Sequence, residues 1–134
     1  MTNAGAVIPN KKKTITGIVL STLGAMFMLF DAVLHLLVIT PVVIAFNQLG
    51  YPLGVSRTLG VIELACAILY LIPRTSVLGA VLLTGYLGGA IATQVRVGAP
   101  LLSTGLFPIY IALFLWGGLY LRDARLRSVF PIRK

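Results

Sequence analysis

The chain has 134 residues, of which 58% are hydrophobic and only 10% are charged. Because soluble domains carry about a quarter charged residues, this composition excludes an ordinary soluble domain and predicts one polytopic membrane domain. The formal net charge of +8 is gathered before the first apolar run and after the last. That placement is typical of membrane edges and argues against a nucleic-acid-binding protein.

The first apolar stretch, about residues 15–39, is predicted to be a membrane-spanning helix. It is too long for the apolar core of a signal peptide, about 7–15 residues, and is therefore interpreted as an uncleaved first span. Pro41 predicts its end, since the residue before a proline avoids the helical region. A short amphipathic segment follows and is expected to lie along the membrane surface until glycine and proline residues at 50–54 break it.

Three further spans are predicted at about residues 56–72, 76–95 and 106–121. Ser56 and Ser76 stand where N-caps of the second and third spans are expected. The fold class is therefore an all-α integral membrane protein, a four-transmembrane-helix bundle with a short amphipathic segment between helices 1 and 2. The predicted organisation is a basic N-terminal segment (1–13), a transmembrane domain (14–122) and a basic tail (123–134), with mobile ends.

Four spans place both termini on one side of the membrane. Nine basic residues belong to the termini and the loop between spans 2 and 3, whereas the other two loops carry only Arg57 and Arg96. The positive-inside rule therefore predicts cytoplasmic termini in a multi-pass membrane protein. The nine are Lys11, Lys12, Lys13, Arg74, Arg122, Arg125, Arg127, Arg133 and Lys134.

Polar side chains recur at one depth in the outer half of the predicted bundle. Asp31 and His35 are four residues apart and share one helix face. A carboxylate facing lipid costs at least about 2.5–3.5 kcal/mol, so Asp31 and Glu63 are expected to face the interior. Arg96 is expected to reach Glu63 or to extend outward. The predicted outward-facing polar pocket consists of Asp31, His35, Glu63, Gln94, Arg96 and Tyr110.

Two interpretations of this polar layer stay open. It is either a site for a ligand, a quinone head or a proton, or a set of pairs that only fixes helix register. The single histidine cannot supply bis-histidine haem ligation, and the single cysteine, Cys66, cannot form an internal disulfide. No nucleophilic triad and no metal-ligand cluster is recognisable, so no catalytic residue and no metal site are predicted.

The third span contains a GxxxG pair, Gly85 and Gly89, together with Gly88. Small residues allow helix backbones to approach closely. Three uses of this surface are considered: packing of span 3 against its neighbours within the monomer, a homo-oligomer seam, or close approach of the backbone to a flat ligand.

Most of the chain, from about residue 25, resembles the DoxX-like family of small bacterial membrane proteins, which implies a place in the bacterial inner membrane. The resemblance rests on "IPRT", "LLTGYLGGA", "VRVG" and "LWGGLYLRD" within residues 69–127 and on "LGYP" at 49–52. It implies a four-helix membrane bundle; the family takes its name from a subunit of a thiosulfate:quinone oxidoreductase, and relatives associate with redox and stress systems. Family members often have histidine where Gln94 stands and lysine where His35 stands, so a proton relay through position 94 is not expected here.

Together these features predict an accessory membrane subunit of a redox or stress-linked system, whose polar pocket binds a quinone or other small lipophilic molecule. Gln94 and Tyr110 would donate hydrogen bonds to a ligand carbonyl, and Glu63 or Asp31 would exchange a proton. No cofactor within the chain is predicted beyond a bound quinone or lipid, so redox turnover would need a partner protein. The alternatives are a structural assembly subunit without a ligand and a small proton-coupled transporter, which has few spans for alternating access.

Overall fold

The computed structural model describes residues 10–132, which are helical and contain no strand. This confirms the predicted all-α fold. Four segments are long and apolar enough to cross a membrane: α1, α3, α4, and η1 together with α5. The elements are α1 (Lys11–Leu37), α2 (Thr40–Leu49), α3 (Gly54–Leu71), α4 (Ser76–Arg96), the π-helical turn η1 (Leu101–Gly105), α5 (Phe107–Arg122) and α6 (Ala124–Val129).

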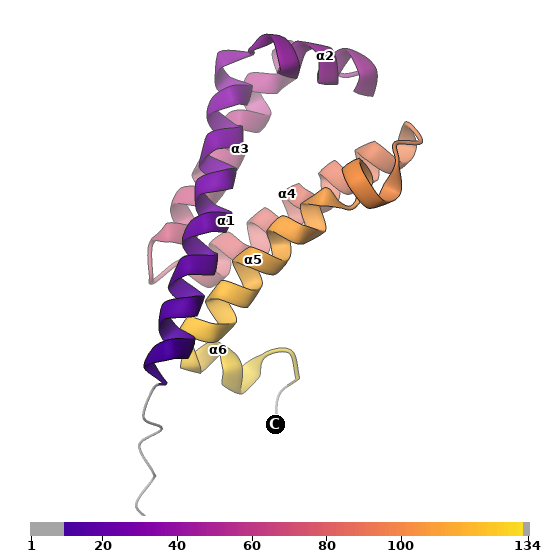
Figure 1. Ribbon diagram of the computed structural model, residues 1–134. Helices are drawn as coiled ribbons and strands as arrows, with labels where there is room; N and C mark the ends of the chain where they lie inside the picture. The colour runs from indigo at the N-terminus through magenta and orange to yellow at the C-terminus, as the bar shows by residue number, and fades with distance from the viewer. Residues whose placement is uncertain (1–9, 133–134) are drawn as a thin grey trace, which may run out of the picture.

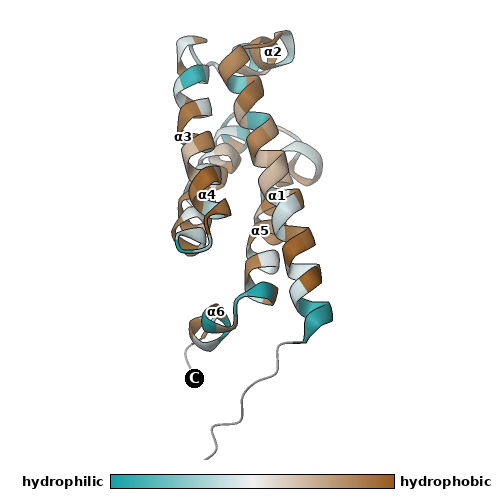
Figure 2. Ribbon diagram, turned by 90° about the vertical axis from the view of Figure 1, so that its left-hand side faces the viewer, coloured by the Kyte–Doolittle hydropathy of each residue, from teal (hydrophilic) through white to brown (hydrophobic). Residues whose placement is uncertain are grey.

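The four long helices form a closed ring in which α1 packs against α3 and α5, and α4 packs against the same two helices. Figure 1 shows that α4 and α5 diverge from α1 and α3 toward the end where α2 crosses. We call this the α2 end. The opposite end, where α1 begins and α6 ends, is called the terminal end. In Figure 2 the long helices are mostly hydrophobic, and hydrophilic colour gathers at the first turn of α1 and around α6.

Large apolar side chains face both inward and outward. The outward ones include Leu37 and Leu113, which are 66% and 64% exposed, as expected for surfaces that face lipid. The inward ones form one core near the middle and the terminal end of the ring. Its members are Ala25, Met28, Cys66, Ala67, Tyr70, Ala80, Leu83, Leu87, Ile111, Leu115, Leu119 and Leu126.

Glycines set the closest helix contacts. A Cβ added to Gly17 of α1 would lie 2.7 Å from the carbonyl oxygen of Gly118 in α5. A Cβ on Gly79 of α4 would lie 2.8 Å from the carbonyl carbon of Leu69 in α3. Backbones approach so closely only where no side chain stands between them, which is how small residues pack helices in lipid.

The first span ends earlier than Pro41 predicted. Its last residue is Leu37, and Val38 takes a left-handed conformation with φ of 51°. Pro41 instead lies in the first turn of α2, where the missing amide hydrogen costs nothing. The predicted amphipathic segment is therefore a helix in its own right.

The expected N-caps of the second and third spans were wrong. Ser56 lies inside α3, and its hydroxyl donates to the carbonyl oxygen of His35 at 2.8 Å. Ser76 is the first residue of α4 and donates to the carbonyl oxygen of Ile72 at 3.0 Å. Both hydroxyls satisfy carbonyl oxygens near helix ends instead of capping amide hydrogens.

Helices extend into both predicted terminal segments. Asn10 caps α1, so residues 11–13 belong to the helix. In the basic tail, Asp123 accepts hydrogen bonds from the amides of Arg125 and Leu126 and begins α6. The side chain of Leu126 is buried in the core. Residues 1–9 of the N-terminal segment and 133–134 of the tail lie outside the described residues.

Candidate functional site

A cavity of about 570 Å³ lies between the diverging helix pairs at the α2 end. It is lined from α1, α2, α3, α4 and α5, and most of its lining is apolar. Asp31, His35, Glu63 and Gln94, all predicted from the sequence, belong to this lining. Its volume falls within the range of about 300–1,000 Å³ that small-molecule sites occupy.

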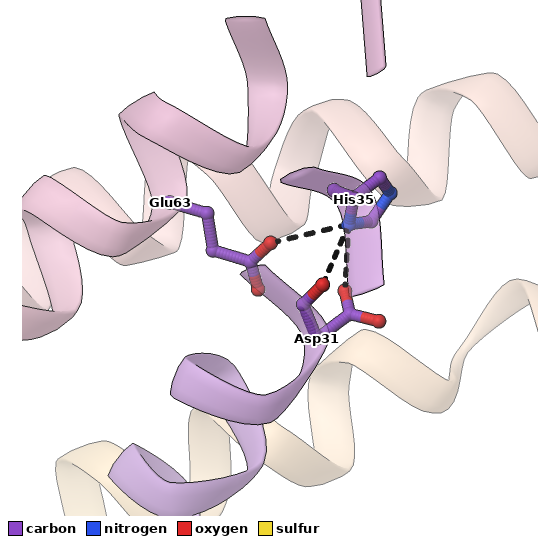
Figure 3. Close-up of side chains that lie close together, drawn as sticks. All are labelled: Asp31, His35 and Glu63. Atoms are coloured by element: carbon purple, nitrogen blue, oxygen red, sulfur yellow. Dashed lines mark hydrogen bonds and ion pairs between the residues drawn. The ribbon is translucent and has the colours of Figure 1, made fainter. Parts of the chain in front are cut away.

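Three of these side chains meet across two helices. The Nδ1 atom of His35 lies 3.5 Å from Oδ2 of Asp31 on the same helix and 3.5 Å from Oε2 of Glu63 on α3. Figure 3 shows both carboxyl groups directed at this one nitrogen, while the other ring nitrogen points away from them. The four-residue spacing on α1 pairs His35 with Asp31, and the packing of α3 against α1 brings in Glu63, which is 28 residues further along the sequence than His35.

The same nitrogen also lies 3.0 Å from the backbone carbonyl oxygen of Asp31. A carbonyl oxygen only accepts, so Nδ1 carries the hydrogen and donates it. The imidazole is thereby held in one orientation. The imidazole also makes an edge contact with the ring of Phe46 from α2, at a centroid distance of 5.7 Å. This contact supports the orientation of the imidazole.

Glu63 is fully buried, with 0% of its surface exposed. Its Oε2 atom accepts a hydrogen bond of 3.0 Å from the hydroxyl of Tyr86 on α4. Its Oε1 atom is buried and has no hydrogen-bond partner. A buried carboxylate oxygen without a hydrogen-bond donor destabilises the folded state, so this acceptor in the cavity wall would gain from a donor.

The charges of the cluster do not balance. Among residues 10–132, the only ion pairs are those of His35 with Asp31 and Glu63. Even with a protonated imidazole, two carboxylates leave one negative charge over. Since unpaired charge is expensive away from water, the cluster reaches neutrality only by holding a further proton or a cationic group.

The three residues offer ligand atoms that lie within 4.8 Å of one another, which raises the question of a metal ion. In the observed arrangement, Nδ1 of His35 donates a hydrogen bond to the Asp31 carbonyl oxygen, so its lone pair is not free for a metal. The lone pair of this tautomer is on Nε2, which Figure 3 shows pointing away from both carboxyl groups. The contacts around Nδ1 are therefore those of a hydrogen-bond network.

Two predicted members of the pocket lie elsewhere. Arg96 does not reach Glu63; its guanidinium donates to the carbonyl oxygen of Leu49 at the end of α2. The Tyr110 hydroxyl donates to the carbonyl oxygen of Leu102 at 3.2 Å, and 44% of the Tyr110 surface is exposed outside the cavity lining. Each side chain bonds a backbone carbonyl oxygen instead of a buried acid.

Side-chain hydrogen bonds also join α4 to α2 and to the α2–α3 connection, which line the cavity at the α2 end. Arg96 holds the end of α2, and the hydroxyls of Tyr51 and Thr93 lie 3.0 Å apart between the α2–α3 connection and α4. Tyr51 and Thr93 also line the cavity beside Gln94. The cavity lining thus combines hydroxyl and amide groups of α4 and the α2–α3 connection with the acids and His35 of α1 and α3.

The three glycines in the middle of α4, unlike Gly79 near its start, do not pack this helix against a neighbour. Nothing lies within 4 Å of a Cβ added to Gly85, Gly88 or Gly89, so the predicted packing within the monomer is wrong. Gly85 and Gly89 instead line the cavity and create part of its volume. This geometry agrees with the third expected use, approach of a ligand to the backbone, and the homo-oligomer seam stays a prediction.

Comparison with known proteins identifies the family of the chain. The family model described as the DoxX-like family matches residues 19–118. The chain belongs to the DoxX-like family. The match begins within α1 and so covers every cavity-lining helix of this DoxX-like membrane protein. No curated protein and no solved structure matches the chain.

Sequence reasoning missed Tyr86. The signal was present, because a phenol in an apolar span needs a hydrogen-bond partner. Glu63 is nine residues after the first residue of α3, and Tyr86 is ten before the last of α4. In antiparallel helices joined by a short turn these positions have the same depth, so counting from the helix ends predicts the pair.

Proposed function

We propose that this DoxX-like protein is an accessory membrane subunit whose cavity binds the polar head of a small lipophilic molecule of the quinone class. The observation that carries the proposal is Glu63, a fully buried acid in the cavity wall with one oxygen lacking a donor. A ligand hydroxyl that donates its hydrogen to this carboxylate would satisfy that oxygen.

The lining supports a ligand with an apolar body and two polar contacts. The Gln94 amide of α4 can donate to a carbonyl oxygen, and the His35–Glu63 pair of α1 and α3 can take up or release a proton. A donor together with a proton acceptor suits a molecule that alternates between carbonyl and hydroxyl forms. Tyr110 has no part in this role, since it lies outside the lining.

Electron transfer would fall to another protein. Flavins, haems and iron–sulfur clusters carry out such chemistry, and the sequence offers one histidine and one cysteine as ligands. We therefore infer that any redox turnover joins this chain to a cofactor-bearing partner, in a bacterial cytoplasmic membrane with the termini cytoplasmic and the cavity outward.

The test is extraction of the purified protein with organic solvent, followed by mass spectrometry, and titration with a short-chain quinone. Wild type is expected to release a quinone and to bind the added one, because Glu63 and His35 present the head-group contacts. Glu63→Gln removes the proton-holding group at constant size and is expected to weaken binding at least about tenfold, equivalent to about 1.4 kcal/mol.

The matched control is Asp123→Asn, since Asp123 is the only acid outside the cluster and asparagine also caps helices. This variant is expected to bind as wild type does. Equal quinone binding by wild type and folded Glu63→Gln, or no binding by either, would overturn the proposal.

A structural assembly role is the second candidate, and one observation favours it. The network from His35 through Glu63 to Tyr86 joins α1, α3 and α4, as a register-fixing set of polar contacts would. In that case Glu63→Gln is expected to lower the thermal stability of the bundle while extraction of wild type yields no quinone. Stability and extraction therefore separate the two roles.

A further inference from the structure

A second hollow lies at the terminal end, away from the cavity. It has a volume of about 500 Å³ and is lined where the start of α1, the start of α4, the end of α5 and the beginning of α6 meet. Its polar members include Ser76, Arg122, Arg125 and one acid, Asp123, and its apolar members include Ile18 and Leu119. It is thus a basic groove with apolar walls at the ends of the membrane-spanning helices.

Arg122 is the central side chain of this groove, and its hydrogen bonds are incomplete. Its Nε atom is buried without an acceptor, and Nη2 donates only a long bond of 3.4 Å to Oγ of Ser76. The guanidinium carbon lies 5.6 Å from the ring centroid of Tyr70, so the aromatic face steadies its position. The guanidinium is thus held in place but keeps hydrogen-bond donors without strong acceptors, which an anion can supply.

No carboxylate supplies that anion within residues 10–132. The ion pairs found there all belong to His35 at the other end of the bundle. The nearest acid in sequence, Asp123, directs Oδ1 to the amides of Arg125 and Leu126. Arg127 differs from Arg122, because it donates to the carbonyl oxygens of Tyr120 and Leu121 at the end of α5.

We propose that this groove binds a phosphate group through Arg122, with Arg125 as the second cation, and that the headgroup of an anionic phospholipid is the source. The planar guanidinium fork matches phosphate oxygens. The groove stands at the level where the apolar helices end and basic residues begin, which is headgroup depth. Its apolar wall of Ile18 and Leu119 would contact the glycerol and first acyl carbons.

The experiment measures binding to the full chain in detergent by native mass spectrometry and by thermal shift. Phosphatidylglycerol is the anionic probe, phosphatidylcholine the zwitterionic one, and inorganic phosphate the lipid-free one. Wild type is expected to bind phosphatidylglycerol most tightly and to gain thermal stability from it. Arg122→Gln is expected to bind at least about tenfold more weakly, as loss of one charge-assisted contact implies.

Arg74→Gln is the matched control, because Arg74 is exposed at the same end but does not line the groove. It removes the same charge and is expected to bind as wild type does. If Arg122→Gln does not accumulate, Arg122→Lys keeps the charge without the Nε–H group, and its binding should fall between the two.

The source is read from competition. Binding of phosphatidylglycerol that inorganic phosphate does not displace supports the lipid headgroup; displacement through Arg122 supports the phosphate site with a soluble anion as its source. Unchanged binding in both Arg122 variants overturns the proposal, as does an equal loss in Arg74→Gln, which would indicate only general surface charge. These outcomes do not depend on the quinone cavity.

Discussion

Glu63 has one carboxylate oxygen bonded to Tyr86 and one without a donor. One oxygen therefore joins α3 to α4 through Tyr86, and the other is the one that the proposed ligand would bond. In the hydrocarbon region, water does not replace a hydrogen-bond partner that either oxygen loses. The residue therefore acts in both the stability and the proposed ligand binding of the bundle.

Tyr86→Phe is predicted to destabilise the protein by about 1–3 kcal/mol, because it removes the hydrogen bond to the buried Glu63 carboxylate and leaves only the 3.5 Å ion pair with His35. The free energy of unfolding can be measured by denaturing titration of the detergent-solubilised protein. Tyr110→Phe removes a hydroxyl from an exposed tyrosine that bonds the Leu102 carbonyl oxygen and should cost much less. Equal losses in the two variants would show that the Tyr86–Glu63 bond carries no special weight.

At the scale of elements, the ring is held by close backbone contacts on one side and opened by glycines on the other. Gly118 of α5 touches α1, so an added Cβ would lie 2.8 Å from the Gly17 carbonyl oxygen, whereas Gly117 has nothing within 4 Å. The glycines Gly85 and Gly89 of α4 face the cavity. The same residue type thus closes one helix pair and enlarges a cavity in another place.

Gly118→Ala is predicted to destabilise the bundle by about 1–3 kcal/mol, because the methyl group forces the α1 and α5 backbones apart. Gly117→Ala on the same helix adds the methyl group to open space and should leave stability unchanged or raise it by a few tenths of a kcal/mol, about the gain in helix propensity. Thermal unfolding of the two variants in one detergent compares them. A stable Gly118→Ala protein would contradict the close α1–α5 contact.

At the scale of the whole molecule, the two ends differ in kind. The α2 end holds the cavity with its acids and histidine, and the terminal end holds the basic groove around Arg122. Basic flanks resist translocation across the membrane, so the charge distribution predicts which end faces the cytoplasm.

This orientation can be measured with single cysteines in a Cys66→Ala background. Leu102→Cys places a thiol at an exposed position (79% exposed) in η1, at the α2 end, and Ser128→Cys places one in α6. A membrane-impermeant maleimide is expected to label the Leu102→Cys protein in intact cells and the Ser128→Cys protein only after lysis. The reverse pattern would contradict the positive-inside prediction.

The sequence by itself determined the four spans, because hydrocarbon requires about 20 apolar residues in each one. It also predicted that Asp31 and His35 share a helix face and that Glu63 turns inward, since spacing and the cost of exposed charge are local properties. The common depth of Gln94 could be read in the same way, by counting residues along antiparallel spans.

The tertiary structure alone decided which groups meet. Arg96 and Tyr110 have flexible or exposed side chains that bond nearby carbonyl oxygens, and no spacing rule predicts that choice. The glycines of α4 fit both packing and open space in the sequence; only the divergence of α4 and α5 from α1 shows that they line a cavity. The physical reason is that depth follows from counting along one helix, whereas facing and divergence depend on how all four helices pack together.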